Sequence, residues 1–354
     1  MKINFLVPTT GLTGGIKVIF AHANNLNFLG HEVTIISPFV LNKDASVKEK
    51  LLGFLKLLKY RIKVMSGKDR PDWFKLDPMV KIIRIENLAA ENVPDTDVTI
   101  ATANETADWL AAYPQSKGKK FYFIQDYEIW TRNKELVDST WRMPLKKIVI
   151  AQRLKKLAET RFHEQVCGVV PNGIDTEQFF NENKKINTAK KILMMYHVLE
   201  KKGFFDGLKA FLIAKDKHSE ISLTLFGAYR PGPEIAGYDF YYRPTPEELR
   251  KLYCQSDIFI WPSREEGFGL PPMEAMACKC AVISTDTGAI RDYAIDEQTV
   301  IIVPPNKPDQ IGEKIIELIE NEKKLSRLSL AGYEKIRGFT WERSTAMLEK
   351  IITK

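Results

Sequence analysis

Short apolar runs alternate with amphipathic segments along the first half of the chain. Apolar and β-branched runs that end at turn-forming residues are typical of strands, whereas apolar positions three or four residues apart are typical of helices. The pattern predicts one helix over residues 14–29. It predicts strands over residues 2–7, 32–37, 80–85, 97–101, 120–125 and 165–170. This alternation is typical of an α/β layer built on a mostly parallel sheet.

The second half of the chain repeats this alternation. Its apolar runs predict strands over residues 191–196, 222–227, 257–261, 281–284 and 300–303. Its amphipathic segments predict helices over residues 204–216, 247–254, 272–278, 309–321 and 323–336. We therefore expect a second α/β domain of similar size, and both domains are expected to be Rossmann-like.

A turn-forming cluster, VPNGID at residues 170–175, separates the two halves. At 354 residues the chain is too long for one ordinary domain. We predict an N-terminal domain over 1–170, a C-terminal domain over 171–338, and a final helical segment over 339–354 that packs back on the N-terminal domain. Sheets of this type bind ligands beyond the carboxyl ends of their strands, so we expect the domains to face each other across a ligand-binding cleft.

The segment REEGFGLPPMEAMA at residues 264–277 carries the strongest chemical signal. It follows a predicted strand, and its two prolines suit the first turn of a helix. Backbone N–H groups at such a helix N-terminus bind phosphate. Glu266 and Glu274 flank the loop, and because like charges repel we expect them to accept hydrogen bonds from hydroxyls instead. A ligand with phosphates in the middle and hydroxyls at both ends is a nucleotide-sugar.

The chain is basic, with a formal net charge of +7. The densest basic segment, residues 47–63, interleaves lysines and an arginine with leucines. A basic amphipathic helix of this kind can lie in an anionic membrane interface. A domain helix with a solvated lysine face is an equal alternative. No nucleic-acid motif accompanies the segment, which disfavours a nucleic-acid partner.

Other signals are weaker or negative. The chain lacks an apolar run long enough for a transmembrane helix, and its N-terminus resembles a first strand more than a signal peptide. Asp95-Thr-Asp97 lies in a proline-containing loop, so we interpret it as turn chemistry and not as a metal motif. We expect reduced core thiols in a cytosolic protein. They are Cys167, Cys254, Cys278 and Cys280, none at metal-site spacing.

Four motifs together resemble a known family. They are EGFGLPPMEAMACK at residues 266–279, VPNGID at 170–175, PTTGLTGGIKV at 8–18 and GHEVTII at 30–36. The chain resembles the family-4 glycosyltransferases of the GT-B fold over nearly its whole length, down to the closing FTWE at 339–342. The resemblance implies a retaining transferase that takes a sugar from a nucleotide donor, UDP- or dTDP-linked, without a metal or other cofactor. It also implies that the first domain holds the acceptor.

The resemblance assigns roles around the long loop. Glu266 would face the hydroxyls of the donor sugar, and Glu274 would accept hydrogen bonds from the ribose. The amides of Phe268, Gly269 and Leu270 would bind the sugar and the diphosphate. Each glutamate has a competing interpretation: Glu274 would complement the macrodipole in the first turn of its helix, and Glu266 would be a solvated loop residue.

The family usually places an arginine five residues before a lysine in the first strand–loop of the second domain. Lys202 matches the lysine, but His197 stands in the arginine position. A neutral imidazole donates one hydrogen bond and brings no fixed charge, so Lys202 is expected to carry more of the leaving-group stabilisation. A histidine packed in the cleft wall is the alternative for His197.

In the first domain, Gly14 and Gly15 would let the backbone approach the donor closely. A tight strand–helix turn is the alternative, and the spacing does not fit the dinucleotide fingerprint. Gln125 stands where many relatives have a histidine, and we interpret it as a contact to the donor sugar or the acceptor. As a hypothesis, this exchange reflects a donor that differs at C6, such as a deoxy sugar.

The sequence as a whole predicts a hexosyltransferase acting on a cell-envelope or lipid-linked glycan. We expect it in the cytoplasm, with peripheral contact to the inner membrane face through residues 47–63 as an open alternative. Two other functions also remain open: a non-catalytic nucleotide-sugar-binding partner subunit, and a nucleotide-sugar epimerase or hydrolase of the same fold.

Overall fold

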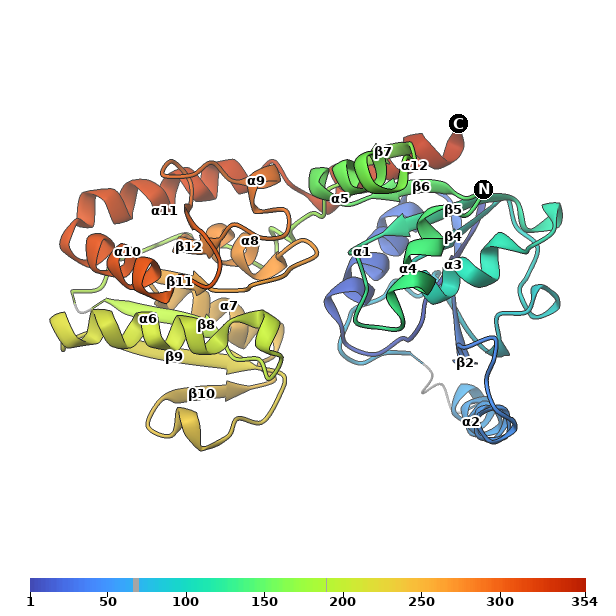
Figure 1. The fold of residues 1–354 in the computed structure, drawn as a ribbon, viewed down its shortest axis with the longest axis horizontal. Coiled ribbons are helices and arrows are strands. Elements are labelled where there is room, and N and C mark those ends of the chain that lie inside the picture. Colours follow the sequence, from blue (N-terminus) through green and yellow to red (C-terminus); the bar gives the residue numbers. More distant parts are fainter. Residues whose placement is uncertain (66–69, 189) are drawn as a thin grey trace. The chain divides into compact units, whose positions relative to one another are not determined.

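The computed structural model describes residues 1–65, 70–188 and 190–354. They form two compact units. The first unit comprises Met1–Asn172 together with Trp341–Lys354, and the second comprises Gly173–Thr340. The chain therefore passes from one unit to the other twice, first inside the turn-forming cluster at residues 170–175 and again just before Trp341 (Figure 1).

The first unit is built on a parallel sheet in which seven strands are described, in the order β3-β2-β1-β4-β5-β6-β7. The strands are β1 (Lys2–Leu6), β2 (Glu32–Val40), β3 (Lys81–Asn87), β4 (Val98–Ala101), β5 (Lys119–Ile124), β6 (Lys146–Val149) and β7 (Val166–Val169). Strand order reverses between β1 and β4, which is the point where open α/β sheets bind ligands. Side chains of β1, β4 and β5 are buried along almost their whole length, as both faces of the sheet are covered.

Helices connect these strands and cover the sheet. They are α1 (Gly14–Phe28), α2 (Val47–Met65), α3 (Asn104–Ala111), α4 (Lys134–Trp141), α5 (Gln152–Leu157) and α12 (Trp341–Thr353). The C-terminal helix α12 packs on α1, where the Nδ1 atom of His22 lies 2.9 Å from the hydroxyl of Thr345. Burial lowers the pKa of His22 to about 3. The final segment of the chain is thereby built into the core of the first unit.

The second unit holds a parallel sheet in the order β10-β9-β8-β11-β12-β13, six strands being described. Its strands are β8 (Lys191–Met195), β9 (Ser222–Gly227), β10 (Asp239–Tyr242), β11 (Ile258–Trp261), β12 (Ala281–Thr285) and β13 (Ile301–Val303). Its helices are α6 (Phe204–Lys217), α7 (Pro246–Gln255), α8 (Leu270–Ala277), α9 (Ile290–Tyr293), α10 (Pro308–Glu320) and α11 (Glu322–Ile336). The order reverses between β8 and β11, so their carboxyl ends define the expected binding edge.

The predicted fold class is confirmed, because both units are Rossmann-like layers with parallel sheets. Two strands were missed. Strand β6 begins with two lysines and β10 is an edge strand with exposed tyrosines, so neither has the apolar run that marks a buried strand. The side chain of Lys147 in β6 is nevertheless buried, and its ammonium group pairs with Glu164 at 2.9 Å.

Candidate functional site

The β11–α8 loop lies at the carboxyl end of a fully buried strand and leads directly into a helix N-terminus. Gly269 precedes α8 with φ of 94°, a left-handed conformation that glycine adopts without strain. The hydroxyl of Tyr293 donates to its carbonyl oxygen at 3.0 Å, and the ring of Tyr293 stacks on Phe268. Within the described residues, the amides of Phe268, Gly269 and Leu270 have no hydrogen-bond acceptor. The loop is thus held rigidly with N–H groups available at the start of a helix.

Glu266, a residue of this loop, contacts Lys202 of the turn after β8. Their Oε1 and Nζ atoms lie 2.6 Å apart, and 9% and 21% of the two side chains are exposed. The hydroxyl of Ser263 donates to the same carboxylate oxygen at 3.0 Å. Two predicted site residues, 64 positions apart in the sequence, are therefore in direct contact.

The turn after β8 places Lys202. Gly203 adopts φ of 64°, and a β-carbon there would lie 2.0 Å from the carbonyl oxygen of Pro262. The amide of Arg264 donates to the carbonyl of Lys201 at 2.7 Å, which ties this turn to the β11–α8 loop. The two loops at the carboxyl ends of adjacent strands β8 and β11 thus form one packed assembly.

His197 lies at the end of β8. Its Nδ1 atom accepts a hydrogen bond from the amide of Leu199 at 3.0 Å, so the hydrogen of a neutral ring sits on Nε2. Desolvation, followed by the charges of Lys202 and Lys201, lowers the pKa of His197 to about 4. At neutral pH the residue is an uncharged hydrogen-bond donor, and its ring also packs edge-on against Tyr229.

Glu274 is buried, with 5% of the residue exposed, and accepts a hydrogen bond from the hydroxyl of Tyr253 at 3.2 Å. One interpretation of its sequence position is wrong. Because α8 begins at Leu270, Glu274 is the fifth residue of the helix and not part of its first turn, so it does not complement the macrodipole there.

The predicted residues of the first unit also come together. Gly14 and Gly15 open α1 directly after β1, with Thr13 capping the helix. A β-carbon on Gly15 would lie 3.3 Å from the Nε2 atom of Gln125, whereas one on Gly14 would meet nothing within 4 Å. The Oε1 atom of Gln125 is buried without a hydrogen-bond partner among the described residues. These three residues belong to the first unit, whereas Glu266, Glu274 and Lys202 belong to the second.

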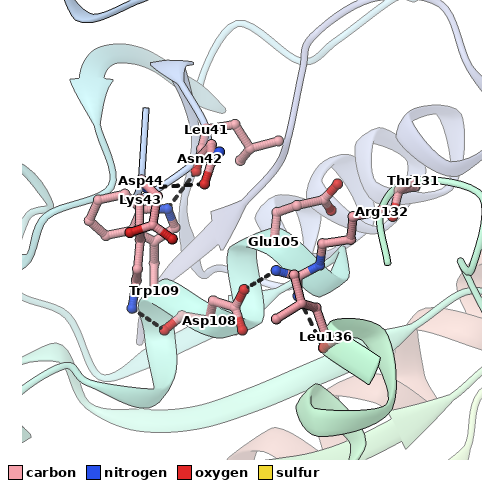
Figure 2. A pocket seen from close by; sticks show the side chains of 10 residues that line it. All are labelled: Leu41, Asn42, Lys43, Asp44, Glu105, Asp108, Trp109, Thr131, Arg132 and Leu136. Atoms are coloured by element: carbon pink, nitrogen blue, oxygen red, sulfur yellow. Dashed lines mark hydrogen bonds and ion pairs between the residues drawn. The ribbon is translucent and has the colours of Figure 1, made fainter. Parts of the chain in front are cut away.

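Sequence reasoning missed a pocket in the first unit (Figure 2). It has a volume of about 380 Å³ and lies beyond the carboxyl ends of β2, β4 and β5. Its lining residues are Leu41, Asn42, Lys43, Asp44, Glu105, Asp108, Trp109, Thr131, Arg132 and Leu136. They come from three separate segments without a common motif. The rule that ligands bind at the carboxyl edge of the sheet was the one signal that pointed there.

A carboxylate with a perturbed pKa lies behind this pocket. The half-buried Glu128 accepts hydrogen bonds at 3.0 Å from both the amide and the side chain of Asn104. Desolvation, together with the nearby charges of Glu105 and Asp126, raises the pKa of Glu128 to about 7, and the two hydrogen bonds oppose that rise. The side-chain amide of Asn104 also donates to the hydroxyl of Thr131, which lines the pocket.

Helix α2 exposes a continuous apolar stripe. Leu51, Leu55, Leu58 and Ile62 follow each other at helical spacing and are 59%, 47%, 40% and 67% exposed. At 100° per residue, Lys48 and Lys59 flank one side of the stripe, while Lys50 and Arg61 flank the other. The opposite face packs against the unit through the buried Gly53 and the ring of Tyr60, which lies against Phe39. A merely solvated lysine face does not account for four exposed aliphatic side chains in one row.

The structure also bears on the predicted metal and thiol sites. The carboxylate of Asp95 pairs with Lys117 at 2.7 Å, and that of Asp97 accepts from the amide of Lys2, so both serve the local structure. No group of three or more potential metal ligands was found among the described residues. The prediction of core thiols is wrong for Cys167, which is exposed because β7 leaves it uncovered, while Cys278 and Cys280 are buried and Cys254 is half-buried. None of the described helices has both the length and the apolar character needed to cross a membrane.

Comparisons with known proteins find relatives of the second unit and solved structures that share the fold. Residues 175–335 match the family model described as Glycosyl transferases group 1. An uncharacterized glycosyltransferase of Methanocaldococcus jannaschii is 33% identical over 109 residues, which cover 31% of each chain. The capsular polysaccharide biosynthesis glycosyltransferase CapM of Staphylococcus aureus is 25% identical over 199 residues, covering 50% of this chain and 52% of that protein. The chain thus spans about a third to a half of the length of these curated relatives.

A similar solved structure is that of Anabaena HepE in complex with UDP and glucose. It superposes with a TM-score of 0.73 at 14% identity and covers 100% of this chain and 99% of that one. At this identity the likeness establishes the fold alone. Residues 175–335 of the second unit are therefore similar to the group 1 glycosyl transferases, and the chain has the two Rossmann-like domains of the GT-B fold.

Proposed function

We propose that this protein is a retaining, metal-independent glycosyltransferase that moves a hexose from a nucleotide-sugar to a hydroxyl acceptor. The contact between Lys202 and Glu266 beside the N-terminus of α8 carries the proposal. A cation, a carboxylate and backbone N–H donors lie together there, which supports binding of a sugar diphosphate. A sugar diphosphate needs all three.

The donor would bind with its diphosphate at the amides of Phe268, Gly269 and Leu270. The charge of Lys202 would stabilise the departing nucleoside diphosphate, and the Nε2–H of His197 would add a neutral hydrogen bond. Glu266 would accept a hydrogen bond from the sugar. Glu274, presented by α8 and held by Tyr253, would accept from the ribose.

Gly14, Gly15 and Gln125 would complete donor binding from the first unit. The Oε1 atom of Gln125, which has no hydrogen-bond partner in the described part of the chain, supports this role because it is a buried acceptor for a sugar hydroxyl. A hydroxyl acceptor that attacks the face from which the diphosphate leaves would give retention. The rate would then come from positioning and charge stabilisation.

We further propose that the acceptor is a cell-envelope or lipid-linked glycan and that α2 binds an anionic membrane surface. Its apolar stripe with cations on both flanks is the arrangement of an interfacial helix. The capsular polysaccharide enzyme of S. aureus supports this acceptor class by its name alone.

A thermal-shift screen with UDP, dTDP, GDP and their sugar conjugates tests donor binding, because a ligand that binds only the folded chain raises its melting temperature. We expect stabilisation by a UDP- or dTDP-sugar, weakened by Glu274→Gln and unaffected by Glu313→Gln, which changes an exposed carboxylate on α10. Incubation of the stabilising donor with and without acceptor glycans then separates transfer from epimerisation or hydrolysis. Stabilisation without turnover of any kind would favour a non-catalytic binding subunit.

Sedimentation with vesicles of anionic or zwitterionic lipid tests the membrane contact. We expect binding to anionic vesicles alone, and its loss in the double variant Lys56→Glu/Lys59→Glu. The matched control is Lys323→Glu/Lys335→Glu, which reverses two exposed charges on α11. Equal loss in both double variants would show an effect of net charge and would contradict a specific role for α2.

A further inference from the structure

The pocket beyond β2, β4 and β5 combines an apolar wall with polar groups that point to a ligand. The indole N–H of Trp109 donates to the carbonyl of Leu41 at 2.7 Å, so the ring presents its apolar surface and not a donor. Leu41 and the exposed Leu136 extend this apolar wall (Figure 2). The pocket volume of about 380 Å³ lies within the range typical of small-ligand sites.

The polar groups of the pocket are incompletely satisfied by the protein. Arg132 pairs with Asp108, yet its Nε atom is buried without a hydrogen-bond acceptor among the described residues. The carboxylate of Glu105 has no hydrogen bond or ion pair within the described part of the chain. The pocket thus offers a buried donor and a charged acceptor, Arg132 and Glu105 (Figure 2), and an occupant with hydroxyl groups can bond to both.

The charge of the pocket excludes one class of occupant. Asp44, Glu105 and Asp108 bring three negative charges, against two positive charges from Lys43 and Arg132. Lys43 is itself engaged, donating to the carbonyl of Asp108 at 2.7 Å with its ammonium group 5.2 Å from the centroid of the Trp109 ring. A site with a net negative charge repels a diphosphate, so this pocket is unsuited to a nucleotide.

We infer that the pocket binds a neutral sugar residue of the acceptor glycan, an inference that rests on the proposed glycosyltransferase function. The C–H face of the sugar packs on Trp109, and its hydroxyls bond to Glu105 and Arg132. The wall segment of residues 41–44 is followed after two residues by α2, whose apolar stripe is the proposed membrane contact. The pocket wall therefore leads directly into the N-terminus of the proposed lipid-binding helix, which favours a lipid-linked glycan as the source of the sugar.

Saturation-transfer NMR on the full chain tests this inference with methyl α-mannopyranoside, methyl β-galactopyranoside and N-acetylglucosamine as neutral probes. Glucose 1-phosphate serves as the anionic probe. We expect at least one neutral probe to bind this pocket. We expect the anionic probe to bind it no more tightly than that neutral probe. Glu105→Gln keeps the shape of the side chain and removes its charge, so it is expected to weaken binding about tenfold. Glu91→Gln, an exposed carboxylate of the same unit outside the pocket, is the control and is expected to leave binding unchanged.

The outcomes separate this inference from the proposed function. UDP at saturating concentration is expected to leave the neutral-probe signal in place, because the nucleotide binds the second unit. Displacement by UDP, equal binding in wild type and Glu105→Gln, or absence of binding by every neutral probe would each overturn the inference. If UDP still stabilises the protein in that case, donor binding stands without the pocket. Should a neutral probe bind while no nucleotide does, the pocket stands and the proposed donor site falls.

Discussion

The two units share one fold, but one carboxylate near each candidate site has a very different set of partners. In the second unit, Glu266 pairs with Lys202 at 2.6 Å and Asp206 pairs with Arg264 at 2.8 Å. In the first unit, the hydrogen bonds described for the carboxylate of Glu128 come from the neutral amide groups of Asn104. The negative charges of Glu105 and Asp126 lie nearby and help to raise its pKa.

This difference matches the ligands proposed for each unit. A lysine held in place beside a helix N-terminus can stabilise the charge that develops on a departing diphosphate. An acceptor-rich surface with a net negative pocket suits a neutral, hydroxyl-bearing ligand instead. Fold alone therefore does not decide the ligand, because the carboxyl edges of the two sheets carry different charged side chains.

The largest expected effect breaks the charge balance of the second unit. Lys202→Gln keeps a hydrogen-bond donor for Glu266 but removes the positive charge that would stabilise the departing nucleoside diphosphate. We expect turnover to fall by about 10²–10³-fold with little change in donor KM, since the charge develops in the transition state. Steady-state kinetics with the donor found by the thermal screen would measure this.

The matched control is Lys201→Gln, which removes the neighbouring charge and leaves the Lys202–Glu266 pair intact. We expect it to lower turnover less than tenfold. A raised donor KM at unchanged turnover in Lys202→Gln would mean that the lysine binds the ground state and the transition state equally, contrary to the role proposed.

A second test concerns the rigidity of the same loops. Gly203→Ala adds a β-carbon 2.0 Å from the carbonyl oxygen of Pro262, in a left-handed conformation. We expect it to lower the free energy of unfolding by about 3 kcal/mol. Gly237→Ala shares the left-handed conformation, with φ of 93°, but meets nothing within 4 Å and is expected to cost about 1 kcal/mol. If denaturant titrations show that both variants lose the same free energy of unfolding, the packing of the two loops does not contribute to stability.

Much of the second unit was predictable because its chemistry is local. Strand, glycine-rich loop and helix follow one another within residues 257–277, so the apolar run and the prolines of that segment define the site. The prediction of Lys202 beside Glu266 relied on the resemblance, and the structure brings the two together across 64 residues. The sequence could not reveal that the amide of Leu199 fixes the tautomer of His197, because that requires the geometry of a turn.

The first unit was less predictable because its pocket is assembled from distant segments. Trp109, Arg132 and Asp44 each look ordinary in sequence and acquire meaning only at a shared sheet edge. The sequence also could not decide whether α2 is a membrane-interface helix or a domain helix with a solvated lysine face. The exposure of Leu55 and Ile62 depends on which face of the helix packs against β2 and β3. Periodicity marks an apolar stripe but not whether protein or another partner covers it.

A third prediction sharpens the electrostatic contrast through pH. A raised pKa means that the folded chain binds a proton at Glu128 that the unfolded chain, with a value near 4.5, releases. The resulting contribution to stability is fully present below pH 4.5 and is lost as the pH rises through about 7. Glu128→Gln, which stays neutral, is therefore expected to be more stable than wild type in alkaline buffer by up to about 3 kcal/mol.

Denaturant titrations across this pH range provide the measurement. The two proteins are expected to converge in acid, and Glu135→Gln, an exposed carboxylate on α4, is expected to follow wild type throughout. A constant difference between Glu128→Gln and wild type at every pH would show a packing effect and no linked proton.

The smallest expected effect distinguishes the two glycines that open α1. Gly14→Ala points its new methyl group into open space, so the loss of unfolded-state entropy is expected to stabilise the protein by about 0.5 kcal/mol. Gly15→Ala places its methyl group 3.3 Å from the amide nitrogen of Gln125 and must displace that side chain, which is expected to cancel the gain.

The KM for the donor supplies a second readout for these two variants. If Gln125 contacts the donor sugar, Gly15→Ala raises this KM although its stability is unchanged. A larger rise in Gly14→Ala would instead mean that the donor approaches the backbone of α1 and not the side chain behind it.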